Sequence, residues 1–275
     1  MPPSCPAHAT KHVPLLAFST PNATFHLAQL QDGVANGTAL WLGAQCLAAY
    51  LAESHLRYRS TPPTPAAIEL GSGVGLTALS LTSLGWNVLA TDISLVITSV
   101  LNSNVRNNYH VLPPGSGHIQ LAELDWLVPP HHWRWDHPDI IASTAVSPLP
   151  SLREPLLPPP YDLICTADTI YDSALLTPLL RSLHTLSSLS AAVSPTRRPP
   201  PVLLCLERRD PALVDRFIHE AATTWHFLTE RIPHRKLAKA IKKHYPHWSK
   251  HDWEGVELWK LILITNPRSV DACAE

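Results

Sequence analysis

The chain has 275 residues, 45% of them hydrophobic, which is enough to bury the core of one α/β domain. Its 21 lysines and arginines nearly balance 22 aspartates and glutamates, so the net charge of −1 gives no bias toward polyanions such as nucleic acid. The five cysteines lack C-x-x-C spacing, and their odd number does not suit a disulfide framework; they are Cys5, Cys46, Cys165, Cys205 and Cys273. With no signal peptide and no apolar run of about 18 to 20 residues, we expect a soluble cytoplasmic protein with reduced thiols.

Prolines divide the chain into structured segments. The 28 prolines cluster at 2–14, 62–65, 129–160 and 195–201, where loops are expected because proline lacks an amide donor. Apolar runs between them predict seven strands, at 66–70, 87–91, 119–124, 161–166, 202–206, 225–232 and 256–264. Helical patterns lie at 39–54, 75–84, 95–107, 173–189 and 211–223. This order predicts a Rossmann-like α/β fold with a seven-stranded, mostly parallel sheet and helices on both faces.

No internal repeat or second core is visible, so we predict one domain at 39–266. An N-terminal extension, 1–38, precedes it, and a C-terminal tail, 267–275, follows it. The stretch 129–160 has no periodicity and is long for a connection in a compact domain. We therefore predict that it is a proline-rich surface insertion.

A glycine turn follows the first predicted strand. Residues 67–76 read Ala-Ile-Glu-Leu-Gly-Ser-Gly-Val-Gly-Leu and run from an apolar strand into an apolar helix, which is the context of a nucleotide-binding turn. Gly71 and Gly73 let the backbone approach a ligand closely, and the helix start offers free amides. A nicotinamide enzyme uses the same physics. However, Leu76 stands where the last glycine of G-x-G-x-x-G is expected, and Glu69 suits a cationic ligand end better than a pyrophosphate. The turn therefore favours S-adenosylmethionine.

Two later strand ends carry further candidates for this cofactor site. Asp92 lies about 20 residues beyond the turn, where a carboxylate can accept hydrogen bonds from both ribose hydroxyls. Capping of the next helix is the structural alternative for Asp92, and both roles can coexist. Asp125 and Trp126 end the third strand, where the indole can stack on an adenine ring, although one tryptophan among nine is by itself more often a packing residue.

These segments together resemble the class I seven-strand protein-lysine N-methyltransferases of the D-x-x-Y type, similar to methyltransferase family 16, which modify cytosolic proteins. The D-x-x-Y motif is the most specific feature, with Asp168 and Tyr171 directly after the fourth strand. The other matching segments are 40–41, 46–51, 69–76, 91–92, 101–105, 124–126 and 167–171. The pattern is most similar to a fungal-type enzyme acting on translation elongation factor 1-alpha. The proline-rich insertions depart from the family pattern. They leave the identity of the substrate open, but they do not affect the expectation that the cofactor binds.

The resemblance implies roles for individual residues. Asp168 and Tyr171 would face the acceptor lysine, Asp168 as an orienting group or as a general base, and Tyr171 as a wall of the lysine channel. A helix cap for Asp168 and a buried ring for Tyr171 are the structural alternatives. The predicted cofactor site comprises Trp41, Glu69, Gly71, Ser72, Gly73, Asp92, Asp125, Trp126 and Ala167.

Other features are less specific. The 16 histidines show no zinc-like pairing with cysteines, so no metal is expected. Residues 234–244 predict a basic helix, which is more often a solvated face than a binding site. Residues 207–210, Glu-Arg-Arg-Asp, end the fifth strand and either anchor the next helix or touch the substrate.

The leading hypothesis is methylation of a protein lysine, with no membrane partner and no nucleic acid. A second hypothesis is methylation of a small molecule or nucleic acid on the same scaffold. Methyltransferases that act on nucleic-acid amines usually carry an N/D-P-P-Y turn, whereas this turn reads Ala-Asp-Thr-Ile-Tyr. A third hypothesis is a catalytically silent S-adenosylmethionine-binding partner protein, against which the intact motifs count.

Overall fold

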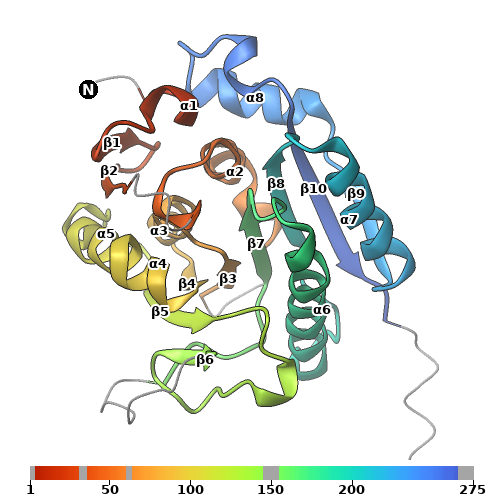
Figure 1. Cartoon of the computed structure of the whole chain (residues 1–275). Coiled ribbons are helices and arrows are strands. Elements are labelled where there is room, and N and C mark those ends of the chain that lie inside the picture. Colours follow the sequence, from red (N-terminus) through yellow and green to blue (C-terminus); the bar gives the residue numbers. More distant parts are fainter. Residues whose placement is uncertain (1–3, 31–35, 60–63, 145–154, 266–275) are drawn as a thin grey trace, which may run out of the picture.

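The structure is a computed structural model that describes residues 4–30, 36–59, 64–144 and 155–265. An eight-stranded sheet runs through its centre, with helices packed on both faces (Figure 1). Its strands are β3 (Ala66–Leu70), β4 (Asn87–Asp92), β5 (Ile119–Leu124), β6 (Ile140–Ala142), β7 (Leu163–Ala167), β8 (Val202–Glu207), β9 (Phe227–Arg231) and β10 (Val256–Leu263). The predicted α/β class with a mostly parallel sheet is confirmed, but the sheet has eight strands where seven were predicted.

The order of the strands places a ligand site at one edge of the sheet. Across the sheet the order is β6-β5-β4-β3-β7-β8-β10-β9. Neighbours from β6 to β8 are parallel, whereas β10 is antiparallel to both β8 and β9. From β3 the chain continues to β4 and β5 on one side and later returns to β7 on the other. Open α/β sheets bind ligands at the carboxyl ends of the strands beside such a reversal.

The helices largely follow their predicted ranges. Helix α7 matches its predicted range, and the predicted helix at 95–107 is divided by a π-helical turn. The helices are α1 (Ala7–Thr10), α2 (Leu42–Ser54), α3 (Leu76–Ser83), α4 (Ser94–Val96), the π-helical η3 (Ile97–Leu101), α5 (Asn102–Asn108), α6 (Leu176–Val193), α7 (Pro211–Thr223) and α8 (His234–His244). Short 3-10 turns are η1 (Asn36–Thr38), η2 (His55–Arg57), η4 (Tyr109–Val111), η5 (Pro130–His132), η6 (Ser173–Leu175) and η7 (Lys250–Trp253). No helix in the described ranges is long and apolar enough to cross a membrane.

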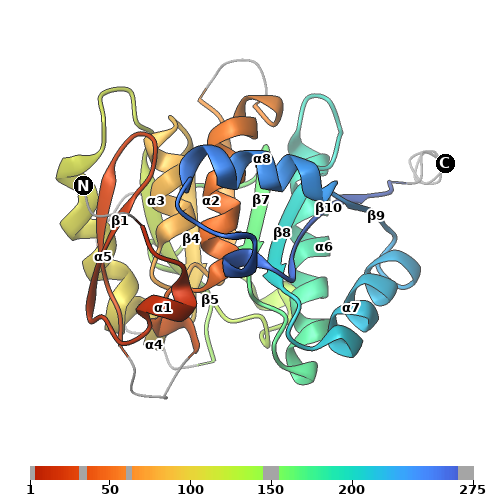
Figure 2. The ribbon, with the colours of Figure 1, turned by 90° about the horizontal axis from the view of Figure 1, so that it is seen from above.

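Side chains alternate along the strands into two buried clusters, one on each face of the sheet. In β7, Leu163 and Cys165 belong to one cluster and Ile164 to the other. Helices α2, α3, α5 and α8 cover the first face, and α6 and α7 cover the second (Figure 1). Helix α8 lies across α2 (Figure 2). A sheet covered on both faces needs strands that are apolar throughout, which explains the continuous apolar runs of the sequence.

The segment before α2 contains a hairpin that the sequence did not reveal. Strands β1 (Leu15–Ser19) and β2 (Thr24–Ala28) pair antiparallel and lie beside α5 (Figure 2). Phe18, Phe25 and Leu27 are completely buried and belong to the first cluster. Asn104 of α5 binds the edge of β2, because its Oδ1 accepts from the Ala28 N–H at 2.7 Å. The hairpin within the predicted N-terminal extension is therefore packed into the domain core.

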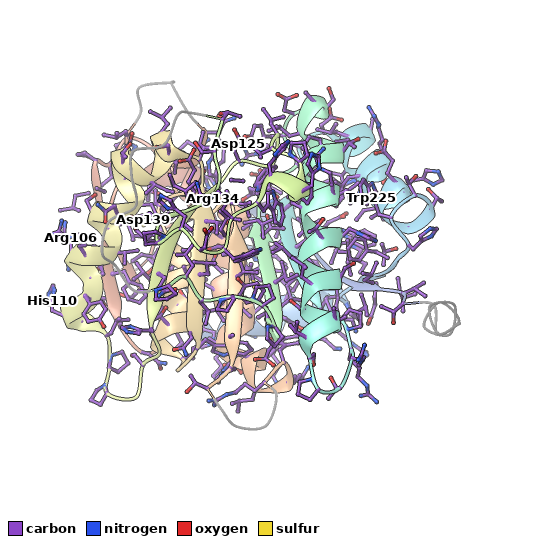
Figure 3. The ribbon with its side chains drawn as sticks, turned by 90° about the horizontal axis from the view of Figure 1, so that it is seen from below. Arg106, His110, Asp125, Arg134, Asp139 and Trp225 are labelled. Carbon is purple, nitrogen blue, oxygen red and sulfur yellow. The ribbon has the colours of Figure 1, made fainter. Side chains whose placement is uncertain are left out.

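The predicted surface insertion at 129–160 needs a correction. Its described part contributes β6, which pairs with β5 and extends the sheet. Trp133 and Trp135 pack against the second cluster, and Leu156 is buried in it. Figure 3 shows this segment, with Arg134 and Asp139 labelled, crossing the sheet on the side of α6. Residues 145–154 of the insertion, and the predicted tail 267–275 with Cys273, lie outside the described residues.

Candidate active site

A cavity of about 630 Å³ opens at the carboxyl ends of the neighbouring strands β5, β4, β3, β7 and β8. Its volume suits a small-molecule ligand, for which sites of about 300 to 1,000 Å³ are usual. Asp125, at the end of β5, is labelled at this edge of the sheet in Figure 3. The cavity therefore lies where the strand order predicts a ligand site.

The glycine turn between β3 and α3 forms the floor of the cavity. Gly71 and Gly73 have φ angles of +69° and +55°, which side chains rarely adopt. A Cβ at Gly71 would lie 2.8 Å from Cγ2 of Thr169, and one at Gly73 would lie 3.1 Å from the carbonyl oxygen of Gly37. Both positions therefore require glycine, as the sequence pattern predicts.

Asp92 connects this turn to the end of β4. Its Oδ2 accepts a hydrogen bond from the Gly73 N–H and its Oδ1 from the Ile93 N–H, each at 2.8 Å. Burial raises the pKa of Asp92 to about 6, although both amides oppose this shift. The carboxylate lines the cavity and is fixed in place, as a contact to ribose hydroxyls requires.

Glu69 and Ser72 do not line the cavity. Glu69 is 1% exposed beneath the turn, and burial raises its pKa to about 8, while the nearby Ser72 and Thr77 hydroxyls act in the opposite direction. Its Oε2 and both of these hydroxyls nevertheless have no well-aligned hydrogen-bond partner among the described residues. The predicted contact between a Glu69 carboxylate and the cationic end of a ligand is not supported by this position.

Asp125 and Trp126 form the wall beside β5. The Asp125 carboxylate accepts from the Leu127 N–H at 2.9 Å and from Oγ1 of Thr144 at 3.1 Å. The Trp126 ring approaches Gly71, and its Nε1 is buried without a partner among the described residues. This end of the cavity is otherwise apolar, and is lined by Ile93, Leu95, Val96, Leu124 and Leu127. These apolar side chains suit an aromatic ring better than a charged group.

Asp168 lies directly after β7 at the opposite end of the cavity. Its φ of +52° is in the left-handed region. Its Oδ2 accepts from the Gly43 N–H at 2.6 Å, and its Oδ1 accepts from the Glu207 N–H at 2.8 Å. Burial raises its pKa to about 6. Asp168 does cap a helix, but the helix is α2, whereas Asp172 caps the turn before α6.

Tyr171 and Ala167 line the cavity as predicted from the D-x-x-Y motif. Tyr171 is 51% exposed, so the alternative of a buried ring is wrong. Partial burial, with Asp92 and Asp172 nearby, raises the pKa of its hydroxyl. The tyrosine therefore stays neutral near pH 7 and forms part of the rim.

Trp41, the residue directly before α2, also lines the cavity. Its Nε1 donates to the carbonyl oxygen of Asn36 at 2.6 Å. Lys11 Nζ lies 4.0 Å from the ring centroid and Arg209 Cζ lies 4.3 Å from it. Cations stack favourably on the face of an indole. Trp41 is thus held by groups from three separate segments of the chain.

Several lining residues were not among the predicted site residues. Glu207 ends β8, Arg209 and Asp210 come after it, and all three line the cavity beside Asp168. Because Arg208 also hydrogen-bonds Asp215 of α7, the segment 207–210 both lines the cavity and anchors the next helix. Asp210 also caps α7, because its Oδ1 accepts from the Leu213 N–H. A second missed group, Asn36 and Gly37, covers the glycine turn from η1. A charged run at a parallel strand end was the signal that pointed to the first group.

The charge of the cavity is strongly one-sided. Five carboxylates line it, whereas Arg209 is the one basic side chain among the described lining residues; the carboxylates are Asp92, Asp125, Asp168, Glu207 and Asp210. In the described ranges no three His, Cys, Asp or Glu side chains gather in a way that could hold a metal ion. The cavity therefore favours cationic ligands over phosphates.

Known proteins resemble this chain in sequence. A family described as lysine methyltransferase matches it over residues 21–146. The mouse protein N-lysine methyltransferase METTL21A is 30% identical over 186 residues, which cover 66% of this chain and 70% of that protein. The chain belongs to this lysine methyltransferase family. The family resemblance seen in the motifs is thereby confirmed, and the family depends on S-adenosylmethionine.

Other matches are shorter or more distant. Human methyltransferase-like protein 22 is 32% identical over 91 residues, which are 33% of this chain and 22% of that protein's length. Among solved structures, the T. thermophilus 16S rRNA N2 G1207 methyltransferase RsmC has a TM-score of 0.45 and 12% identity, and the match covers 94% of this chain and 47% of that one. A human methyltransferase 10 domain containing protein has a TM-score of 0.45 and 10% identity, covering 83% and 85%.

Proposed function

We propose that this chain transfers a methyl group from S-adenosylmethionine to the side-chain amine of a lysine in another protein. The observation that carries the proposal is the charge of the cavity, in which five carboxylates face one arginine. A sulfonium cofactor and a lysine side chain are both cationic, so both are attracted to such a site. Family membership supports the same reaction.

The cofactor fits the half of the cavity beside β3, β4 and β5. Gly71 and Gly73 line this half with backbone alone, which a ligand can approach closely, and Asp92 is positioned to accept hydrogen bonds from ribose hydroxyls. The apolar wall with Trp126 suits the adenine ring. When bound, S-adenosylmethionine supplies a methyl group activated by its positively charged sulfur.

The acceptor fits the half beside β7 and β8. A lysine amine is mostly protonated near pH 7, so the site must favour loss of a proton and then orient the lone pair. The two backbone N–H donors fix Asp168 where it can orient the amine, because each carboxylate oxygen keeps a second lone pair. Tyr171 at the rim walls the entry of the lysine side chain. Holding the amine and the methyl group together is the main contribution of the protein.

Incubation with methyl-tritiated S-adenosylmethionine and an extract from cells lacking this protein tests the proposal. The expected result is label in protein that is removed by protease and resists ribonuclease. Label in RNA or in small molecules would instead indicate methylation of a nucleic acid or a small molecule. Cofactor binding without any label would indicate a silent partner protein.

Elongation factor 1-alpha is the substrate that we propose to test first, with methylation in the cytoplasm. The support is the resemblance of the motifs to a fungal-type enzyme with that substrate. Purified, unmethylated elongation factor 1-alpha should take up label at a lysine. If the extract is labelled while the purified factor is not, the substrate is a different protein.

A further inference from the structure

Glu207 and Arg209 form an ion pair on the acceptor side of the cavity. Oε2 of Glu207 accepts hydrogen bonds from Nε of Arg209, at 2.8 Å, and from its Nη2. No described residue donates a hydrogen bond to the other oxygen, Oε1. The Glu207 side chain is 32% exposed and lines the cavity, so this oxygen can be reached by a ligand.

Arg209 is itself held from the other side. Its guanidinium lies over the indole of Trp41, with Cζ 4.3 Å from the ring centroid, and Lys11 Nζ lies 4.0 Å from the centroid of the same side chain. The cation–π contact and the two hydrogen bonds to Glu207 together restrict the orientation of the guanidinium. Arg209 therefore fixes the position of the Glu207 carboxylate before a substrate arrives.

The neighbouring carboxylate, Asp168, is engaged differently. Both of its oxygens accept backbone N–H groups, and one of these donors is the amide of Glu207 itself. This bond places the two acidic residues side by side, and the negative charge of Glu207 contributes to raising the pKa of Asp168. Arg209 reduces the repulsion between them, since its charge acts on Asp168 in the opposite direction. Of the two carboxylates, Glu207 has an oxygen, Oε1, that can bind a cation in addition to Arg209.

We propose that Glu207 binds the charged end of the acceptor lysine through its open oxygen, while Arg209 and Trp41 hold the carboxylate in position. This inference rests on the proposed function and specifies which carboxylate receives the substrate. Arg209 stays stacked on Trp41 when the lysine enters, because the lysine approaches Oε1 and not the oxygen paired with Arg209. Glu207 is thus the binding group, and Asp168 is the deeper group that orients the amine.

Substitution of Glu207 by glutamine tests the role of the negative charge without changing the shape of the side chain. Glu207→Gln keeps the side-chain length and the backbone N–H that binds Asp168, but removes the negative charge. Loss of a charged hydrogen-bond partner should raise the apparent KM for the protein substrate about tenfold or more. The maximal rate should change less than about threefold, and the affinity for S-adenosylhomocysteine should not change, since Glu207 lies across the cavity from Asp92.

Two further variants complete the experiment. Glu207→Asp keeps the charge and should restore part of the lost affinity, which a merely structural role would not predict. Glu220→Gln is the matched control, because Glu220 pairs with Arg216 on α7 and does not line the cavity. The full-length variants are assayed with saturating tritiated S-adenosylmethionine and increasing concentrations of the cell extract. Calorimetry with S-adenosylhomocysteine measures cofactor affinity in parallel.

The outcomes distinguish this inference from the function on which it rests. A raised KM in Glu207→Gln, partly restored in Glu207→Asp and absent in Glu220→Gln, supports the inference. Lysine labelling by the wild type with an unchanged KM in Glu207→Gln overturns the inference alone. Weaker cofactor affinity in Glu207→Gln overturns it as well, because Glu207 then belongs to the cofactor side. A wild type that labels no lysine overturns the proposed function and this inference with it.

Discussion

Asp92 and Asp168 end two strands with the same arrangement. Each carboxylate accepts two backbone N–H groups, from Gly73 and Ile93 in one case and from Gly43 and Glu207 in the other. Acceptors fixed before the ligand arrives need no reorganisation during the reaction. The site is therefore built in advance on the ends of β4 and β7.

Replacement of Asp92 by alanine should weaken cofactor binding. Hydrogen bonds to a charged group contribute about 1.5 to 3 kcal/mol, which corresponds to about 10- to 100-fold in Kd. Calorimetric titration with S-adenosylhomocysteine measures this change. An unchanged Kd in Asp92→Ala would remove Asp92 from the ribose contact.

Glu69 should make the stability of the protein depend on pH. Its pKa is raised to about 8 in the folded state from an ordinary value of 4.5, so the folded state binds more protons between these values. The contribution of Glu69 to stability is therefore greatest below about pH 4.5 and decreases as the pH rises toward 8.

The variant Glu69→Gln lacks this titration. Its free energy of unfolding relative to the wild type should increase from pH 5 to pH 8.5 by about 4 kcal/mol, because about three pH units of this window lie between the two pKa values and each contributes about 1.4 kcal/mol. Urea unfolding at both pH values measures the difference. A difference that is equal at both pH values would show that Glu69 is ionised in the folded protein.

At the scale of elements, the turn after β3 is the segment that the sequence described best. Gly71 combines a left-handed backbone with close contacts to Thr169 and Trp126, whereas Gly115 has a similar φ of +83° and no atom within 4 Å of the position that a Cβ would take. Both glycines have a left-handed backbone, but only at Gly71 would a Cβ meet close neighbours. Comparing them therefore separates the cost of backbone strain from the cost of a steric clash. Left-handed backbone alone costs a residue with a side chain about 1 to 2 kcal/mol.

Gly71→Ala should destabilise the protein more than Gly115→Ala does. The alanine at position 71 adds a clash to the backbone strain and also blocks the cavity floor, so cofactor affinity should fall at least about tenfold. Gly115→Ala should leave that affinity unchanged. Chemical unfolding and calorimetry measure the two effects. Equal losses of stability in both variants would contradict the close approach seen at Gly71.

Asp168 joins the start of α2 to the end of β8, so it stabilises the fold as well as the site. Asp168→Ala should lower the free energy of unfolding by about 1 to 3 kcal/mol, because two buried N–H groups lose their acceptor. Asp172→Ala removes an exposed cap and should cost about 1 kcal/mol or less. At temperatures where Asp168→Ala is folded, it should bind the cofactor and lose methyl transfer. Full activity would remove Asp168 from the acceptor site.

The elements that could be predicted from the sequence are those whose hydrophobic pattern lies within the element itself. Strands β3 and β5 and helix α7 match their predicted bounds because each is a continuous apolar or amphipathic run. Strand β6 was missed since three residues between prolines and tryptophans have no period, and it is a strand only because β5 offers an edge. Glu69 was assigned to the ligand from its position and charge, but its side chain is buried beneath the turn and does not line the cavity.

At the scale of the whole molecule, the overall composition does not reveal the negative charge of the cavity. The chain is nearly neutral, with a net charge of −1, yet its main cavity gathers five carboxylates and one arginine from strand ends far apart in the sequence. No single motif contains this imbalance. It arises because parallel strands bring all their carboxyl ends to one edge of the sheet. The fold therefore creates the preference of the cavity for cationic ligands.

The most direct test is the chemical identity of the methylated residue. Protein from the extract, labelled with tritiated S-adenosylmethionine by the wild-type chain, is hydrolysed in acid and separated by amino-acid chromatography. The account predicts that the label elutes as Nε-methylated lysine and is lost when Asp92→Ala replaces the wild type at limiting cofactor concentration. Label that elutes as methylated arginine or histidine, or that is absent from protein, would contradict it.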